Sequence, residues 1–500
     1  MKWKAQSVKP SLSPITLTYT FCDSTMATAT TTLSSISSGH IDSLAAQEPS
    51  WLGSIRRQAF LQYQSLPAEV SPLYSKYSDV NKIKPESIHF STQTTTPAVL
   101  SKDLSERLKE IERETGILQV GQEINKIFIR DNVAKQGIIL SSITDALANH
   151  GDLLKLHISA NQPNYLEDKF LALEGSAFQS GIFIYIPRDV MLEEPIRIIT
   201  SLAEDGTSLI SRNIVVADTG SKATIVQELY APGSSGRQDV QQGYFELVET
   251  HVNPNAHLEL VTLQAMGHDT INVSNRKAFI ERDGKMSWYL GMFGSLLSRY
   301  KTDGVMIGPG ASSEDVEIVF GVGNQSFDVT SNLIHRAPHT RGRVLVKSVL
   351  KDHSKSLFKG MIKIDKQGRG TESYLAGHAI LLDRGAKSDA IPGLEIETNE
   401  VKATHSASVA QMDENQIYYL TTRGLNREGA KREIVAGFLE PLSRKMGPTI
   451  RAWINYLIES KWQGKQLMLR TDEAMEQILE VEKSRYRETQ DLFEKHYKYR

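Results

Sequence analysis

The sequence contains very little cysteine: Cys22 is the one cysteine among 500 residues. This excludes an intramolecular disulfide framework, a CxxC redox centre, a cysteine-rich zinc site and an all-cysteine iron–sulfur site within this chain. If translation starts at Met26, the protein has no cysteine at all. Scarce cysteine fits a reducing compartment, and we expect a cytoplasmic protein.

The sequence also lacks an excess of either charge and any long hydrophobic run. It has 57 Lys and Arg against 59 Asp and Glu, which gives a formal net charge of −2. A general nucleic-acid-binding protein needs a basic excess to displace counterions from phosphates, so we expect no nucleic-acid partner. No apolar run approaches the roughly 18 residues of a membrane helix, so we expect no membrane span. Residues 1–27 make a poor signal peptide, because their apolar stretch is weak.

Motifs of several enzyme classes are missing as well. There is no GxxxxGK[ST] loop, so we expect no ATP site of the P-loop type in this chain. The GxSxG nucleophile elbow and the HExxH zinc motif are also absent.

The chain divides into four parts by composition and periodicity. Residues 1–45 are expected to be disordered, because residues 24–43 are dominated by Ser, Thr and Ala. Residues 46–150 are expected to form a mixed, mostly helical domain. Helices are predicted near Trp51, after an N-cap at Ser101 with a stop at Gly116, and over residues 142–149 with Gly151 as the end.

Residues 151–412 have a different pattern. Short alternating runs, such as 182–186 and 316–320, are separated by turn clusters such as 308–310 and 366–370. Short strands without helices of 10–15 residues between them argue against Rossmann and barrel α/β folds. They suit a sandwich, a barrel or a β-solenoid, and the irregular recurrence of the turn-to-strand unit favours the solenoid.

Residues 413–500 are predicted to form a helical domain. Asp413 with Gln416 resembles a capping box, and Gly424 would end that first helix. Asn426 can cap a second helix, Pro448 suits the first position of a third, and residues 471–473 open a fourth, charged helix.

Few side chains suggest chemistry by themselves. His335 and His339 have a spacing that could place two imidazoles on one helix face, but Pro338 disfavours a helix, so strand or loop histidines are the main interpretation and a metal pair the minor one. Glu314 and Asp315 point to opposite faces of a strand, whereas Asp315 and Glu317 share a face. A lone strand histidine such as His405 is most often structural.

Several residue runs resemble the core of the SufB/SufD family of iron–sulfur cluster assembly proteins. Residues 168–173 (DKFLAL) and 181–187 (GIFIYIP) resemble the entry to that core, and residues 331–336 and 356–362 its continuation. The most specific similarity runs from 391–396 (IPGLEI) through 400–405 (EVKATH) to 416–425 (QIYYLTTRGL), then Ala430 and 437–441. The resemblance covers residues 50–465, and the first 45 residues fall outside it.

The resemblance implies a mainly β fold: a right-handed parallel β-helix (β-solenoid) at 151–412 between helical domains. SufB and SufD form a heterodimer, each binds one SufC ATPase through its C-terminal helices, and the complex is a scaffold for an iron–sulfur cluster. By resemblance, the ATPase-docking segment would include Tyr419, Arg423, Gly424, Leu425 and Phe438. Packing within the helical domain is the alternative for each, and the preferred one for Phe438.

Departures from the family pattern point to a SufD-like subunit. SufB has core cysteines that receive sulfur and hold the nascent cluster, whereas residues 23–500 contain none. The SufD-like strand often reads Lys-Cys-Ser-His, and here it reads Lys402-Ala403-Thr404-His405. SufB has His-Glu at this turn, but Ser406 follows His405 here. We therefore expect a non-catalytic scaffold subunit in which His405 presents a neutral imidazole to the iron of a transient, shared cluster while a SufB-like partner supplies thiolate.

Two other interpretations stay open. The chain could form a homodimer that partners an ABC-type ATPase, with a structural or regulatory role and no cluster contact. It could also be a β-helix carbohydrate enzyme, but that class would not explain the helical tail or the residues 416–425.

Overall fold

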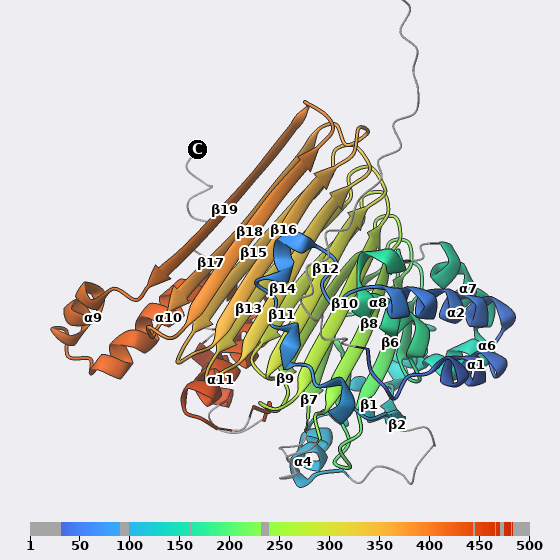
Figure 1. Ribbon diagram of the computed structural model, residues 1–500, viewed down its shortest axis with the longest axis horizontal. Helices are drawn as coiled ribbons and strands as arrows, with labels where there is room; N and C mark the ends of the chain where they lie inside the picture. Colours follow the sequence, from blue (N-terminus) through green and yellow to red (C-terminus); the bar gives the residue numbers. More distant parts are fainter. Residues whose placement is uncertain are drawn as a thin grey trace, which may run out of the picture.

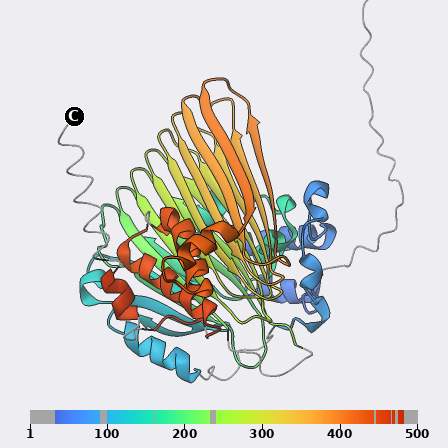
Figure 2. The same cartoon turned by 90° about the vertical axis from the view of Figure 1, so that its left-hand side faces the viewer.

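The computed structural model describes residues 32–90, 100–160, 163–231, 240–443, 446–465, 467–470, 475–481 and 483. A long stack of parallel β-strands forms its centre, with helices at one end and along its sides (Figure 1). The chain starts at the helical end, winds through the stack, and continues from the other end into helices that return along one side (Figure 2).

The stack is a parallel β-solenoid of two sheets, and this confirms the predicted fold class. Consecutive strands alternate between a sheet of odd-numbered strands, the odd sheet, which also holds β2, and a sheet of even-numbered strands, the even sheet, which also holds β3. The solenoid strands are β4 (Ile182–Ile186), β5 (Ile196–Ser201), β6 (Leu209–Ala217), β7 (Lys222–Tyr230), β8 (Gly243–Val252), β9 (His257–Ala265), β10 (Ile271–Ile280), β11 (Lys285–Met292), β12 (Leu297–Met306), β13 (Ser312–Gly321), β14 (Ser326–His335), β15 (Arg341–Leu350), β16 (Lys355–Ile364), β17 (Thr371–Leu381), β18 (Lys387–Ile396) and β19 (Val401–Gln411).

Side chains alternate between the solenoid interior and the outer face of each sheet. In β11, Met286 and Trp288 belong to the buried interior cluster, whereas in β13 Ile318 packs in the cluster on the outer face. The register stays constant from coil to coil: Trp288 pairs with Leu260 on one side and with Asp315 on the other. Equivalent positions of successive coils therefore share one environment.

The turns stack as regularly as the strands. Asn255 and Asp283 both have positive φ, 60° and 55°, and their N–H groups donate to the carbonyls of Arg282 and Pro309 in the next coil. Gly310 (φ 74°) follows in the next turn, where a Cβ would lie 2.2 Å from the Asp283 Oδ1. Glycine is required there because of both the backbone conformation and the space.

The first coils are closed by antiparallel strands and helices. β1 (Thr115–Val120) pairs in parallel with β5 and antiparallel with β2 (Glu123–Phe128), and β3 (Ile139–Ser142) is antiparallel to β4. A second hydrophobic cluster joins the even sheet to the N-terminal helices. These helices are α1 (Ser38–Ala46), α2 (Ser50–Ser65), α6 (Ile143–Asn149), α7 (Gly151–Ala160) and α8 (Lys169–Ala177), with η3 (Tyr165–Glu167) before α8 and α5 (Asp131–Ala134) before β3.

Residues 66–90, here called the N-terminal strap, cross the outer face of the even sheet (Figure 1). The strap contains α3 (Pro72–Ser75), η1 (Val80–Lys82) and η2 (Pro85–Ser87). Lys82 donates to the Asn324 carbonyl at 2.6 Å, and Glu69 forms an ion pair with Lys359 of β16 at 3.3 Å. Polar contacts therefore fix the strap across several coils.

Buried ion pairs lie on the outer face of the even sheet beneath the helices. Arg299 of β12 is 2.7 Å from Asp168, the N-cap of α8, and Arg212 of β6 is 2.6 Å from Glu249 of β8. Arg212 and Glu249 are both completely buried. Removal of one partner would leave the other charge out of water, so each pair constrains how the helices sit on the sheet.

The C-terminal helices cover the outer face of the odd sheet (Figure 2). α10 (Arg427–Ser443) and α11 (Pro448–Trp462) lie against the sheet, and α4 (Lys102–Ile111) joins the same cluster, whereas α9 (Glu414–Thr421) lies outside it. Trp462 stacks on Phe320 with 5.7 Å between ring centroids, and the Arg197 guanidinium lies 4.1 Å from the ring centroid of Trp453. No helix in the described part of the chain is long and apolar enough to cross a membrane.

Most predicted helix starts are confirmed. Ser101 caps α4 by accepting from the Leu104 N–H, and Ser142 caps α6 in the same way. Asp413 caps α9, and Pro448 occupies the first turn of α11. Cys22, Met26 and Thr471, the start of the expected fourth helix, lie outside the described residues.

Four expectations for the N-terminal half were wrong. Residues 33–46 are not disordered: α1 forms there, and Leu33 and Ile41 are buried, because a few apolar residues among the Ser and Thr suffice to dock on α2. Gly116 lies within β1, and α4 ends earlier, at Ile111. Gly151 starts α7 instead of ending a helix. Finally, β1 belongs to the solenoid sheet although it precedes residue 151. The sequence pattern did not predict this, because its partner β5 is far away in the sequence.

The Arg212–Glu249 pair generates a stability prediction. Glu249→Gln should lower the free energy of unfolding by about 3–5 kcal/mol, because Arg212 stays buried without its carboxylate. Urea denaturation followed by tryptophan fluorescence measures this. Glu372→Gln is the control: it breaks the exposed Lys402–Glu372 pair (3.2 Å) and should cost less than about 1 kcal/mol. Equal losses for the two variants would contradict a structural role of the buried pair.

Candidate functional site

Among the residues that the structure describes, no element covers the open side of the final coil of the solenoid. β19 is the last strand of the odd sheet and pairs with β17, and β18 is the last strand of the even sheet and pairs with β16. Leu394 and Ile396 of β18 and Val409 of β19 are 40%, 39% and 44% exposed. This end, called the open end below and formed by β18 and β19, therefore presents two strand edges and apolar side chains to solvent.

His405 lies on β19 at the open end, on its inward face. It pairs in register with Leu375, whose side chain is in the interior cluster, and side chains in register share a face in a parallel sheet. Ala403, two residues earlier, packs against the same cluster. His405 is nevertheless exposed, because no further coil of the described chain covers it. Its imidazole is therefore available to a group placed against the open end.

The outer face of the same strands makes different contacts. Ser406 is 3.1 Å from the Tyr374 hydroxyl, and Ser408 is 2.7 Å from Nδ1 of His378. Ser406, the residue after His405, therefore points away from the inward face that holds His405.

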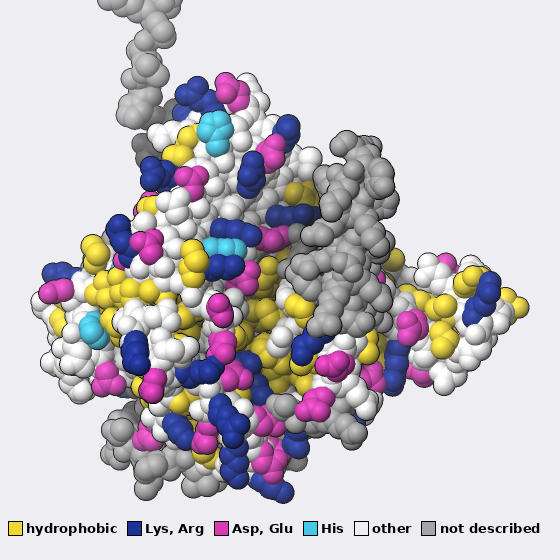
Figure 3. Space-filling model, turned by 180° about the vertical axis from the view of Figure 1, so that it is seen from behind, with side chains coloured by type: hydrophobic (Ala, Val, Ile, Leu, Met, Phe, Trp, Pro, Cys, Tyr) yellow, Lys and Arg dark blue, Asp and Glu magenta, His cyan; other side chains and the backbone are white. Residues whose placement is uncertain are grey.

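The predicted docking residues form a second exposed group, on α9 and just after it. Tyr419 is 57% exposed, and the Arg423 guanidinium lies 5.1 Å from its ring centroid and donates to its hydroxyl at 3.2 Å. Gly424 has φ 98° and ends this segment, and Leu425 is 37% exposed. In Figures 1 and 3, α9 projects from the body of the protein and presents hydrophobic side chains among charges.

The structure does not bring Phe438 or His405 to this group. Phe438 on α10 packs against the outer face of the odd sheet, where Lys347 of β15 contacts its carbonyl and lies 4.6 Å from its ring centroid. This contact favours packing, the alternative preferred for Phe438. His405 lies six residues before the end of β19, about 20 Å along the strand from Gln411. The two exposed groups are thus separate surfaces.

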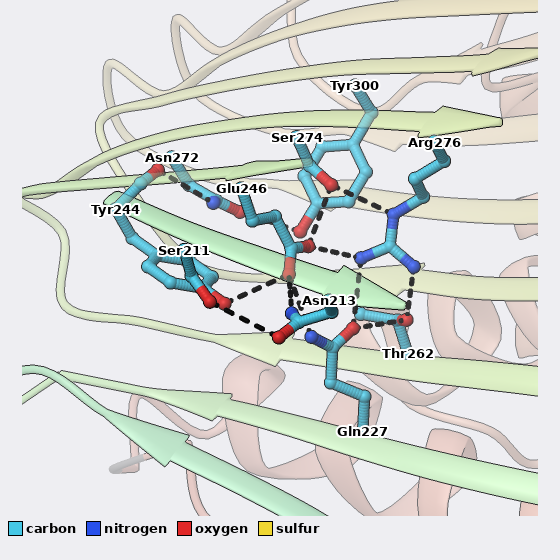
Figure 4. Close-up of polar contacts among 10 residues, drawn as sticks. All are labelled: Ser211, Asn213, Gln227, Tyr244, Glu246, Thr262, Asn272, Ser274, Arg276 and Tyr300. Carbon is cyan, nitrogen blue, oxygen red and sulfur yellow. Dashed lines mark hydrogen bonds and ion pairs between the residues drawn. The ribbon is translucent and has the colours of Figure 1, made fainter. Parts of the chain in front are cut away.

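A polar network fills the middle of the solenoid interior (Figure 4). Glu246 of β8 accepts hydrogen bonds from Gln227 at 2.8 Å and from Ser274 at 2.7 Å, and it pairs with Arg276 of β10. Arg276 also donates to Thr262 at 2.7 Å. The remaining members are Ser211, Asn213, Tyr244, Asn272 and Tyr300.

The sequence interpretation missed this network. The one available signal was that Asn272, Ser274 and Arg276 occupy alternate positions of a strand, and that pattern normally marks a solvent-exposed face. Here it marks the interior, and the hydrogen bonds between strands compensate for the burial of the charges.

A buried carboxyl pair lies one step further along the interior. Asp315 and Glu317 of β13 share one face, as predicted, and this face is the inward one, where Ser331 donates to Glu317 at 2.8 Å. Burial, together with the neighbouring Glu317, raises the pKa of Asp315 well above its usual value, and burial raises the pKa of Glu317 to about 7. The pair therefore holds at least one proton at neutral pH.

His335 and His339 do not face a common site. His335 ends β14 and is buried, with Nδ1 2.8 Å from Thr340 and Nε2 3.0 Å from Ser373, and burial lowers its pKa to about 3. His339 has φ 59° in the following turn. Both are strand or turn histidines, the main interpretation of the sequence. Within the described residues, no group of three or more His, Cys, Asp and Glu is placed to hold a metal ion.

Comparison with known proteins gives a consistent result. Residues 199–438 match the family model described as SUF system FeS cluster assembly, SufBD core domain, and residues 29–198 match that of the SufBD protein N-terminal region. An iron–sulfur cluster assembly SufBD family protein of Staphylococcus saprophyticus is 26% identical over 431 residues, covering 84% of this chain and 90% of the relative. A relative with the same description in Staphylococcus aureus is 25% identical over 430 residues, covering 83% and 90%.

The interior carboxyl pair generates a pH prediction. A carboxyl whose pKa rises on folding binds more protons in the folded state, so its contribution to the free energy of unfolding falls as pH rises from about 4.5 to 7. Glu317→Gln should remove the Glu317 share of this slope, leaving that of Asp315, and should stabilise the protein at pH 8 by on the order of 2 kcal/mol. Denaturant titrations at pH 5, 6, 7 and 8 measure it.

Glu314→Gln, which changes the opposite face of the same strand, is the control and should keep the wild-type slope. If Glu317→Gln also keeps the full wild-type pH slope of the free energy of unfolding, Glu317 does not bind a proton on folding.

Proposed function

Because the chain belongs to the SufBD family of iron–sulfur cluster assembly proteins, we propose that it is a non-catalytic, SufD-like scaffold subunit of a SUF complex. Its partners would be a cysteine-bearing SufB-like paralogue and a SufC-like ATPase in the cytoplasm. The cluster is the cargo of this complex, and it would be held only transiently.

The observation that supports the proposal most strongly is the open end. An uncovered strand edge of 11 residues invites pairing with another chain, and soluble proteins normally protect such edges. Apolar side chains at this end, including Leu394 and Val409, would be buried by a second solenoid that stacks against it. A heterodimer formed end to end would satisfy both requirements.

His405 would then lie inside the interface. A neutral imidazole nitrogen is a good iron ligand, and the described core of this chain has no thiolate to offer. The partner subunit would therefore supply the thiolates and receive the sulfur, while His405 contributes one nitrogen ligand from this side.

The ATPase would bind at the other exposed group. Tyr419, Arg423 and Leu425 project on and after α9, and an aromatic residue, an arginine and an aliphatic residue together are typical of interface hot spots. ATP hydrolysis in that partner would move the C-terminal helices and, through them, rearrange the interface at the open end.

A homodimer that partners the ATPase without contacting a cluster is the second candidate. The absence of cysteine from residues 23–500 favours it, because two copies of this chain would bring no core thiolate to the interface.

The first prediction concerns His405. We expect His405→Ala to leave folding and complex formation intact and to lower cluster loading several-fold, because one iron ligand is lost. The three proteins are co-expressed, purified through a tag on this chain and reconstituted anaerobically, and iron–sulfur absorbance is measured. His378→Ala, on the outer face of β17, is the matched control and should load normally. Unchanged loading in His405→Ala would remove His405 from the site.

The second prediction concerns the ATPase. Tyr419→Ala should weaken ATPase binding by at least tenfold, because a central aromatic contact is lost, while the paralogue still co-purifies. Surface plasmon resonance with the purified ATPase measures the affinity. Tyr77→Ala is the control: it truncates another exposed tyrosine, which lies on the strap, and it should bind the ATPase normally. Wild-type affinity for the Tyr419 variant would place the docking site elsewhere.

A further inference from the structure

Lys461 on α11 is a buried lysine at the junction of the C-terminal helices and the solenoid. This residue is 6% exposed. Its Nζ donates to the Phe293 carbonyl, which follows β11, and to the Gln325 Oε1 at 2.7 Å, which precedes β14. One lysine of α11 thus joins two turns of the solenoid.

The surroundings of Lys461 provide neutral acceptors and aromatic rings. Its Nζ lies 5.9 Å from the ring centroid of Phe320 and 5.7 Å from that of Phe327. Among the described residues, no carboxylate is within ion-pair distance of this ammonium group, although most other buried cations of the protein have one. Desolvation without a compensating charge lowers the pKa of Lys461 well below its usual value.

Among the described residues, His268 also interacts electrostatically with Lys461. His268, in the turn between β9 and β10, has its pKa lowered by burial and by Lys461, and raised slightly by the neighbouring Asp269. His268 is therefore neutral above pH 7, so the charge state near Lys461 above that pH changes through Lys461 itself.

The remaining contacts of α11 with the odd sheet are apolar and aromatic. Leu457 and Ile454 are buried against the odd sheet, and Trp462 stacks on Phe320. When α11 separates, Lys461 enters water and regains its ordinary affinity for a proton.

We propose that docking of α11 on the solenoid releases a proton from Lys461, so that acidification loosens the C-terminal helices and alkalinisation holds them in place. This inference concerns the isolated chain and does not rest on the proposed function. If the ATPase does bind at α9, the protonation of Lys461 would determine how strongly a movement of the C-terminal helices is coupled to the solenoid.

The sign and size follow from linkage. The separated state binds one more proton than the docked state at every pH between the lowered pKa of Lys461 and about 10.4. Over that range the equilibrium constant for opening falls with rising pH, with a limit of about tenfold per pH unit for one proton.

Hydrogen exchange of the full chain tests the proposal. Peptides covering residues 448–462 are followed by mass spectrometry at pH 7.0, 8.0 and 9.0, and exchange rates are divided by the intrinsic rates to give protection factors. We expect the wild-type protection factor to rise by up to tenfold per pH unit. In Lys461→Met, which has no titratable group, the rise should disappear.

Three further variants make the result decisive. Lys461→Gln keeps a neutral donor for Phe293 and Gln325, and it should also be flat, which covers the case in which the methionine variant does not fold. Lys102→Met, which removes a lysine that is 88% exposed, and His268→Gln should both keep the wild-type rise. Equal pH dependence in wild type and in the folded Lys461 variants would overturn the proposal, and so would loss of the rise in His268→Gln.

Discussion

Parallel strand pairing between successive coils is the interaction on which this structure depends. Each strand from β6 to β17 takes its backbone partners from the coil before and the coil after, so a solenoid has no edge along its length and two edges at its ends. At the first coils the antiparallel strands β2 and β3 and the N-terminal helices occupy that position. At the last coil nothing in the described chain does so. The asymmetry between the two ends places His405 in solvent although its face is inward.

Charge is distributed through this fold in a way that serves specificity more than stability. Buried ion pairs such as Arg212–Glu249 join strands on the outer face of the even sheet, and Arg276–Glu246 joins them in the interior. Such pairs contribute little net stability, but a misplaced partner is costly, so they fix register and helix position. Lys461 is different because neutral groups surround it, and its burial is therefore sensitive to pH.

Sequence patterns predicted the strands well and the boundaries less well. Alternation marked β4 and β19, and N-cap residues such as Ser101 and Asp413 marked the helix starts, because these signals are local. The pairing of β1 with β5 could not be predicted from local patterns, since it joins residues that are about 80 positions apart in the sequence. α1 was missed because its few buried apolar residues are meaningful only once α2 lies against them. The interior network was missed because polar residues at alternate positions look the same whether they face water or one another. His405 was found through the family resemblance, but its exposure follows from the absence of a covering coil, which no local pattern contains.

Pairing of the open end with a cysteine-bearing paralogue is the central claim, and hydrogen exchange of β19 tests it most directly. Alternate amides of β19 point away from β17 and should exchange rapidly in the isolated chain, then become protected in the complex. Protection of residues 401–411 on addition of the paralogue, with little change in the already buried strand β11, is the predicted result. Unchanged exchange in β19, within a complex that forms nevertheless, would contradict the account.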